Sequence, residues 1–307
     1  EMENQTDRSE FIFLGLSSDP QLQIFFFVIF FTIYFITLSG NITIILVIKT
    51  DPSLYSPMYY FLSHLSFVDI CYSTDIVPKM LANLLMKQKT ISSTGCLTQM
   101  FFSLLLSVTE VFILSAMAYD RYTAVCHPLH YVVVMSKSVC SYLLMGSWLM
   151  GLSFAVINTV PIFKVQFCGF HEIRHFSCEL PPLLKISCSD TFLNNIILYS
   201  SVVIFGLGSF LPTLISYIHI ISAILKIRST EGRSKAFSTC SSHLTVVGLL
   251  YMTGMSQYTK PSSISSVVVD ELFSVQYSIL TPMLNPIIYS LKNKEVKRAL
   301  GKLFGKK

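Results

Sequence analysis

The sequence predicts an all-α membrane protein: a bundle of seven transmembrane helices followed by a short amphipathic C-terminal helix. Two observations support this fold class. Of the 307 residues, 52% are hydrophobic and 13% are charged, whereas soluble domains carry about 25% charged residues. The charges cluster between seven long apolar segments, and a spanning helix needs about 20 mostly apolar residues. This pattern argues against a soluble enzyme, a disordered chain and a nucleic-acid-binding protein.

The apolar segments lie near residues 23–48, 58–82, 97–125, 139–162, 194–227, 237–259 and 268–290. Each is longer than a strand and lacks strict alternation, so each is expected to be a helix. The sequence KNKEVKRALGKLF at 292–304 places apolar residues at helical spacing between Lys and Arg, which is typical of a helix on an anionic membrane surface. We expect one domain over 1–307, with an outer segment at 1–22, the bundle at 23–290 and an inner helix and tail at 291–307.

The basic residues set the expected orientation. With the N-terminus outside, the inner side holds 14 of the 22 Lys and Arg residues and the outer side holds the remaining 8. Inner loops are enriched in basic residues, so we expect a multi-pass protein of the plasma membrane with an extracellular N-terminus and no cleavable signal peptide. Asn4, in the sequon Asn4-Gln5-Thr6, would then be a glycosylation site.

Four prolines interrupt the apolar segments and are expected to bend their helices, because each removes a backbone hydrogen bond. They are Pro78, Pro212, Pro282 and Pro286. The last two lie four residues apart in one segment, which favours a functional bend there.

Four of the eight cysteines fall on the expected outer side, where thiols oxidise. They are Cys96, at the start of the third segment, and Cys168, Cys178 and Cys188 in one loop. An even number predicts two disulfides, and the spacing leaves three pairings open.

The same loop contains His171-Glu172-Ile173-Arg174-His175, a formal match to the HExxH zinc-protease motif. That motif acts on a regular helix with a third ligand elsewhere, whereas this one lies in a short stretch between cysteines. We therefore expect solvated loop histidines and neither a protease nor a metal centre.

Two carboxylates, Asp69 and Glu110, are expected in the middle of the second and third spans. Ionisable residues inside a membrane are costly and are therefore candidates for function. On a helical wheel Glu110 shares one face with Ser103, Ser107, Leu114 and Arg121. Since two carboxylates facing one space cannot both remain charged at low cost, we expect them to share a proton or to hold a cation, with Asn285 as a neighbour.

Several strings resemble signatures of one family. MAYDRYTAVCHPLHY at 117–131, PMYYFLSHLSFVDI at 57–70, KAFSTCSSHLTVV at 235–247 and PMLNPIIYSLKNKEVKRAL at 282–300 are similar to motifs of the odorant (olfactory) receptors, a branch of the rhodopsin-like G-protein-coupled receptors. Gly40-Asn41 and the C-x9-C-x9-C spacing also match. The resemblance spans about residues 4–304 and is closer to the class II type. The sixth span departs from it at Met252, near the expected pocket, which bears on ligand choice.

The resemblance implies a receptor that binds a small odorant and activates a stimulatory G protein, raising cyclic AMP. It implies disulfides Cys96–Cys178 and Cys168–Cys188. It also implies a sodium ion at Asp69 and Glu110 as the one candidate cofactor. The residues implied for coupling and switching are Asp120, Arg121, Tyr122, Tyr217, His243, Asn285 and Tyr289. Arg121, beside Asp120, would be held in the resting state and released towards the G protein.

The ligand pocket is expected in the outer third of the bundle. Its candidate residues are Ser103, Leu104, Ser107, Val108, Asn158, Glu179, Tyr251, Met255, Tyr258, Ser274 and Ser278. These side chains are apolar or neutral hydrogen-bonding groups, except for Glu179, which could attract an amine. The expected ligand is a small neutral volatile such as an alcohol, aldehyde, ketone or ester.

Three alternatives stay open from the sequence. A receptor of the same fold could sense a metabolite in another tissue. A transporter would use the buried acids, but inverted halves and paired broken helices are missing. An intramembrane hydrolase would need a Gly-x-Ser-x-Gly elbow, which the sequence lacks.

Overall fold

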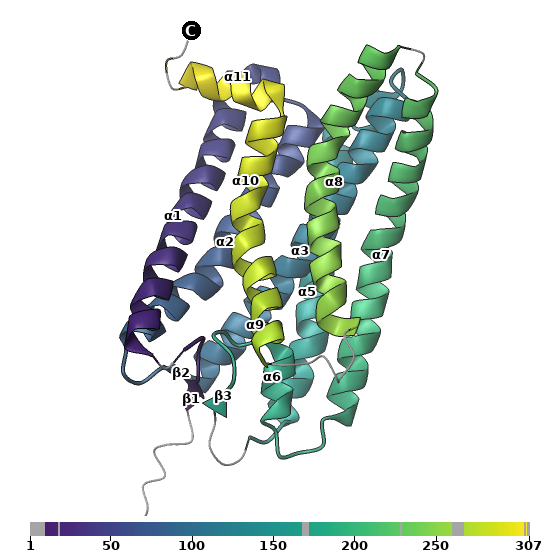
Figure 1. Cartoon of the computed structure of the whole chain (residues 1–307). Helices are drawn as coiled ribbons and strands as arrows, with labels where there is room; N and C mark the ends of the chain where they lie inside the picture. The colour runs from purple at the N-terminus through teal and green to yellow at the C-terminus, as the bar shows by residue number, and fades with distance from the viewer. Residues whose placement is uncertain are drawn as a thin grey trace, which may run out of the picture.

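The computed structural model describes residues 10–17, 19–167, 172–227, 229–259, 267–303 and 305, without the side chains of 235–236, 238–239, 255–259, 267, 291–292, 294 and 303. Seven long helical segments form a bundle (Figure 1). They are α1 (Pro20–Thr50), α2 (Pro57–Leu85), α3 (Ser93–Cys126), α5 (Lys137–Thr159), α7 (Phe192–Leu225), α8 (Thr230–Thr259) and a last segment of α9 (Val267–Val275), a π-helical turn η3 (Gln276–Leu280) and α10 (Thr281–Lys292).

The predicted fold class is confirmed, because each of the seven predicted spans is a helix in this bundle. Among the described residues, four helical stretches are long and apolar enough to cross a membrane: α1, α3, α5 with the short helix η2 (Val160–Lys164), and α7. Side chains that face away from the bundle are also apolar, for example the exposed Phe25, Phe31 and Phe35 of α1. Lipid tails accommodate such a surface, whereas water does not.

Helix α11 (Lys294–Leu303) crosses one end of the bundle, opposite the β-strands (Figure 1). We call these two ends the α11 end and the strand end. Val296 and Ala299 are buried against the bundle, as the predicted amphipathic pattern requires. Lys302 Nζ lies 3.1 Å from an oxygen of Asp51, beside η1 (Pro52–Leu54). Hydrogen bonds from Ser53, and then Lys302, lower the pKa of Asp51 to about 2.

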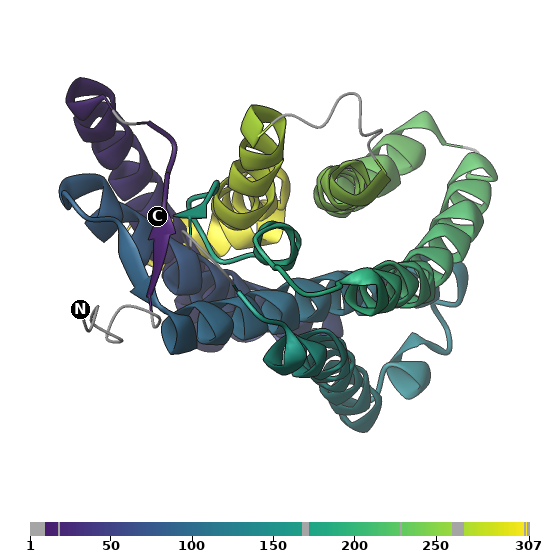
Figure 2. The same ribbon diagram turned by 90° about the horizontal axis from the view of Figure 1, so that it is seen from below.

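A small sheet covers part of the strand end, and the sequence did not predict it. β1 (Glu10–Phe13) pairs antiparallel with β2 (Thr90–Ser92) and parallel with β3 (Glu172–Ile173). Phe11 and Phe13 alternate inward and are buried. The loop with the short helix α6 (Leu180–Lys185) crosses the middle of the ring of helices, as the view along the bundle shows (Figure 2).

The last helical segment is fixed to α1 at its prolines. Pro286 has no N–H, so the carbonyl of Pro282 lacks its usual helical donor. Asn41 supplies one, since its Nδ2 donates to that carbonyl at 3.0 Å. Gly40 lets the two helices approach, because a Cβ there would lie 3.1 Å from Pro286 Cγ. The sequence predicted a bend at these prolines. The structure has a π-helical turn, η3, just before them, and the prolines themselves pack against α1.

Candidate functional site

A cavity of about 180 Å³ lies inside the strand end of the bundle. Its walls come from α2, α3, α5, α7, α8 and the last helical segment, and residues 178–181 of the α6 loop cover it. Most of the lining is apolar, including Val108, Phe112, Phe154, Val202 and Phe205. The polar lining residues are Tyr72, Ser103, Ser107, Glu179, Ser209, Tyr251, Thr253 and Tyr277. Such a space, apolar with a few convergent polar groups, is the usual form of a small-molecule site.

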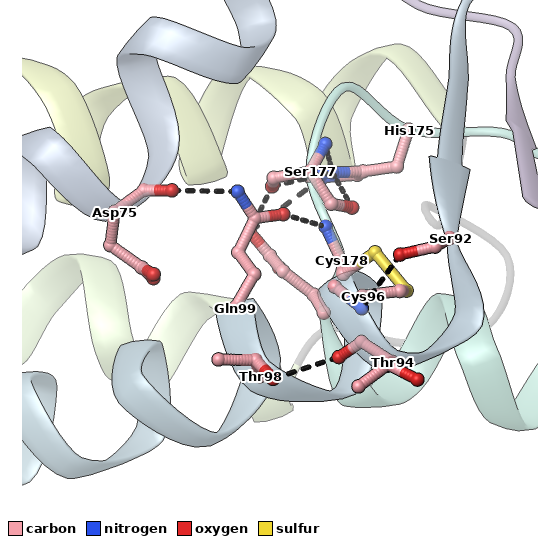
Figure 3. The surroundings of a disulfide bond; sticks show 11 residues. Asp75, Ser92, Thr94, Cys96, Thr98, Gln99, His175, Ser177 and Cys178 are labelled. Atoms are coloured by element: carbon pink, nitrogen blue, oxygen red, sulfur yellow. Dashed lines mark hydrogen bonds and ion pairs between the residues drawn. A yellow bond between two sulfur atoms is a disulfide. The ribbon is translucent and has the colours of Figure 1, made fainter.

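The cover is fixed to α3 by the Cys96–Cys178 disulfide, whose two cysteines are fully buried. Gln99 reinforces this link from one turn further along α3. Its side-chain oxygen accepts from the N–H of Cys178 at 2.9 Å, and its nitrogen donates to the carbonyl of Asp75 in α2 at 2.7 Å (Figure 3). One side chain therefore holds α2, α3 and the cover together at the cavity mouth.

Glu179 joins the same cover to the last helical segment. The Ser274 hydroxyl of α9 donates to its Oε1, and Ser177 Oγ lies 3.4 Å from the same oxygen. His175 Nε2 is 3.8 Å away, in a side chain that is only 1% exposed. The expectation of solvated loop histidines is therefore wrong for His175, which stacks on Phe176 beneath the loop. His171 lies outside the described residues.

Most hydroxyls that face the cavity already donate to their own helix. Ser107 Oγ donates to the Leu104 carbonyl at 3.1 Å, Ser209 to that of Phe205 at 3.1 Å, and Thr253 to that of Leu249 at 2.6 Å. Their oxygen lone pairs remain able to accept a hydrogen bond. The Tyr251 hydroxyl differs, because it is buried with no hydrogen bond of good geometry among the described residues, and the hydroxyls of Ser209 and Thr213 lie close to it. The cavity wall thus offers acceptors and the Tyr251 donor.

Asp69, Glu110 and Asn285 meet below the cavity, all within 2% of full burial. Asn285 Nδ2 lies 3.1 and 2.9 Å from the two oxygens of Asp69 and 3.2 Å from Glu110 Oε1. Glu110 Oε2 and Asn285 Oδ1 have no partner within the described part of the chain. Buried acceptors normally have a hydrogen-bond partner. These two oxygens could therefore be satisfied by a shared proton, a water molecule or a cation.

A second polar group lies towards the α11 end and joins three helices. His243 Nε2 lies 3.0 Å from the Leu114 carbonyl of α3, which accepts only if that nitrogen carries the hydrogen. His243 Nδ1 then accepts from the Tyr217 hydroxyl of α7, 2.5 Å away. The Tyr289 hydroxyl nearby is buried without a partner among the described residues.

The environment of Arg121 differs from the expected one. Within the described residues Arg121 makes no ion pair with Asp120, and its Nε is buried without a partner. Asp120 instead accepts from the Tyr131 hydroxyl of α4 (Tyr131–Val134) at 2.7 Å. Burial, then the Asp120 charge, raise the pKa of Tyr131, so its phenol stays protonated and can donate. Tyr122 contacts His127 at 3.0 Å.

Comparisons with known proteins place this geometry in one family. A sequence model described as "Olfactory receptor" matches residues 30–307. Olfactory receptor 5AR1 of mouse (Mus musculus) is 50% identical over 305 residues, covering 99% of this chain and 98% of the relative. The chain belongs to the olfactory receptor family. Olfactory receptor 8S1 of human (Homo sapiens) is 50% identical over 96% of this chain and 81% of its own length.

The solved structures support the receptor's fold. The crystal structure of squid rhodopsin superposes with a TM-score of 0.72 and covers 94% of this chain and 87% of its own, at 15% identity. This superposition shows the rhodopsin-like fold. Membership of the olfactory receptor family makes the chain a multi-pass membrane receptor and not an enzyme.

The structure gathers part of the predicted pocket of this olfactory receptor. Ser103, Leu104, Ser107, Val108, Glu179 and Tyr251 line the cavity. Three predicted residues are not among those that line it, and their role in ligand binding stays a prediction: Asn158, Ser274 and Ser278. Asn158 bonds Ser201 of α7 at 3.0 Å, Ser274 bonds Glu179 behind the wall, and Ser278 bonds the Ser274 carbonyl of its own helix.

Some predicted features of the receptor lie outside the described residues. These are Asn4, Cys168 and the side chains of Met255 and Tyr258. Cys188 is disulfide-bonded, but the predicted partner is Cys168, so the pairing stays a prediction.

Six of the seventeen lining residues that sequence reasoning missed are aromatic. Phe154 and Phe205 come from α5 and α7, whose residues are mostly apolar, so periodicity does not separate an inward ring from a lipid-facing one. Phe112 follows the predicted Val108 by four residues in α3. Tyr72 and Tyr277 carried a usable signal, since a phenol in the middle of a span needs a polar neighbour. Their rings lie 5.5 Å apart at the cavity floor.

Proposed function

We propose that this receptor binds a small neutral volatile in the capped cavity and activates a stimulatory G protein that raises cyclic AMP. The cavity is the observation that carries the proposal. In this arrangement the receptor is in the plasma membrane, with the strand end and the N-terminus outside and the α11 end facing the G protein.

The size of the cavity supports a ligand of odorant dimensions. An apolar protein cavity of about 150 Å³ holds one benzene molecule, and this cavity measures about 180 Å³. Burial of apolar ligand surface contributes about 25 cal/mol per Å², and so few atoms give weak affinity. Responses in the micromolar to millimolar range are therefore expected.

The charges around the cavity favour a neutral ligand over an acid or an amine. Neither Lys nor Arg is among the lining residues of the described chain, so a carboxylate would find no cation. Glu179 is the one lining carboxylate, and Ser274, Ser177 and the nearby His175 already surround it. A receptor that senses a metabolite in another tissue is the second candidate function. The same cavity would bind the ligand in either case.

A ligand panel read out as cyclic AMP in receptor-expressing cells tests the proposal. We expect responses to neutral alcohols, ketones or esters and none of comparable strength to octanoic acid or octylamine. The double variant Ser107→Val with Tyr251→Phe removes two lining hydroxyls, an acceptor and a donor, and it should lower potency at least tenfold. Val203, next to the lining Val202 but exposed on the outside of α7, gives the control Val203→Ala. Strong activation by acids alone, or an unchanged double variant, would overturn the proposal.

The coupling step is proposed for Arg121 at the α11 end of α3. An agonist shifts the receptor only through its preference for the active state. Arg121→Ala should abolish the cyclic AMP response while leaving ligand-induced thermal stabilisation intact, because Phe112, the lining residue of α3 nearest to it, lies nine residues away, about 14 Å along the helix. Normal output from a surface-expressed variant would count against this role.

We further propose that Asp69, Glu110 and Asn285 hold a sodium ion that favours the inactive state. The unpartnered acceptors Glu110 Oε2 and Asn285 Oδ1 support this proposal, because hard cations prefer oxygen ligands. The single positive charge of the ion would offset one of the two fully buried carboxylates.

A further inference from the structure

Two glycines line the cavity, one from α7 and one from α8. Gly206 and Gly254 both line the space. A Cβ built at either position meets no described heavy atom within 4 Å. Gly146 and Gly248 also have open space around a Cβ, but they do not line the cavity. Only at Gly206 and Gly254, therefore, does the missing side chain enlarge the site.

Each of the two glycines lies one helical turn from a polar lining residue of its own helix. Gly206 is three residues from Ser209, and Gly254 is three residues from Tyr251, so each pair shares a helix face about 4.5 Å apart along the axis. The Tyr251 and Ser209 hydroxyls lie close together and form one level of the cavity. The widened part of the cavity forms the next level towards the strand end.

We propose that Gly206 and Gly254 select ligands with a cyclic or branched hydrocarbon body attached to a hydroxyl or carbonyl oxygen. The oxygen bonds at the Tyr251 level, and the bulky body fills the open space beside the two glycines. A linear chain of equal carbon number leaves this width empty and loses its contacts there. This inference rests on the proposed function, because it names the ligand class of the same cavity.

The fold itself gives no reason for glycine at these positions. Glycine in a helix interior is less stable than alanine. Neither Gly206 nor Gly254 has a positive φ, and neither permits a close helix contact, in contrast to Gly40. Substitution should therefore leave folding intact while it narrows the cavity.

Cyclooctanol and 1-octanol, which have the same number of carbon atoms and the same hydroxyl, test the inference. We expect the wild type to respond to cyclooctanol at a concentration at least tenfold lower than to 1-octanol. Gly206→Val and Gly254→Val should each raise the half-maximal concentration for cyclooctanol at least tenfold, or about 1.4 kcal/mol. The change for 1-octanol should stay below threefold. Gly248→Val, on an exposed position of α8, is the control and should change neither response.

Surface expression is measured for each variant, and Gly206→Ala and Gly254→Ala provide milder changes should a valine variant fail to reach the surface. A wild type that prefers 1-octanol overturns the inference. So do glycine variants that weaken both alcohols equally. If the wild type responds to neutral odorants and the glycine variants change none of the half-maximal concentrations, only this inference fails. If the wild type responds to acids or amines and to neither alcohol, the proposed function fails with it.

Discussion

Helices α3 and α5 approach so closely at Gly151 that any side chain there should force them apart. A Cβ at this position would lie 2.2 Å from Thr109 Oγ1 and 2.5 Å from the Leu105 carbonyl oxygen, whereas ordinary contact begins at 3.4 Å. Thr109 cannot easily turn away, since its hydroxyl donates to that same carbonyl at 2.7 Å. Relief therefore needs a backbone displacement of about an ångström, and overpacking of this kind costs about 1–3 kcal/mol.

Gly151→Ala should lower the apparent melting temperature of the detergent-solubilised receptor by roughly 2–4 °C for each kcal/mol lost. Ligand potency should fall as well, because Val108 lines the cavity one residue before Thr109. Gly146→Ala is the matched control on α5: a Cβ there meets nothing within 4 Å, so stability should stay constant or rise. Thr109→Ala with Gly151→Ala should recover part of the loss, since the contact with Oγ1 disappears and the carbonyl contact remains. A Gly151→Ala receptor with wild-type melting temperature and potency would refute the close approach.

Three further perturbations address the cover, the acid pair and the three-helix link. Cys178→Ala should free the cavity cover from Cys96 and lower odorant potency at least tenfold, as well as thermal stability by about 2–4 kcal/mol; unchanged dose–response and melting curves would contradict this. Glu110→Gln should remove the sodium dependence of basal cyclic AMP, and the proposed ion site fails if that dependence persists. Tyr217→Phe leaves buried His243 Nδ1 without a donor, at a cost of about 1–3 kcal/mol, and a thermal shift assay that finds no loss would show that this bond does not form.

The bundle could be predicted from sequence because length and composition decide it. The predicted third span, 97–125, became α3 at Ser93–Cys126, and the predicted seventh, 268–290, became Val267–Lys292. The strands could not be predicted in this way. β3 has two residues and β2 has three, too few for an alternating pattern. Their pairing depends on where the bundle places the loops, which is a property of the tertiary structure.

The candidate site, too, could be predicted from the sequence only in part. The face of α3 that carries Ser103, Ser107 and Glu110 could be predicted, because polar residues in an apolar helix mark the side that turns inward. Asn158 and Ser278 follow the same rule and also turn inward, yet their partners are Ser201 and their own helix backbone. Inward direction alone therefore does not distinguish a cavity wall from a helix interface. Which of the two forms depends on how closely the neighbouring helices pack.

Helix α3 connects the three polar groups of the receptor without a break. Ser107 lines the cavity, Glu110 meets Asn285, and the Leu114 carbonyl accepts from His243. These points span seven residues, about 10 Å, and no proline interrupts α3 between them. A ligand that displaces α3 at Ser107 must therefore also change the distances at Glu110 and Leu114. His243 belongs to α8 and its partner Tyr217 belongs to α7. The displacement of α3 therefore also reaches these two helices, on the side of the bundle towards the α11 end.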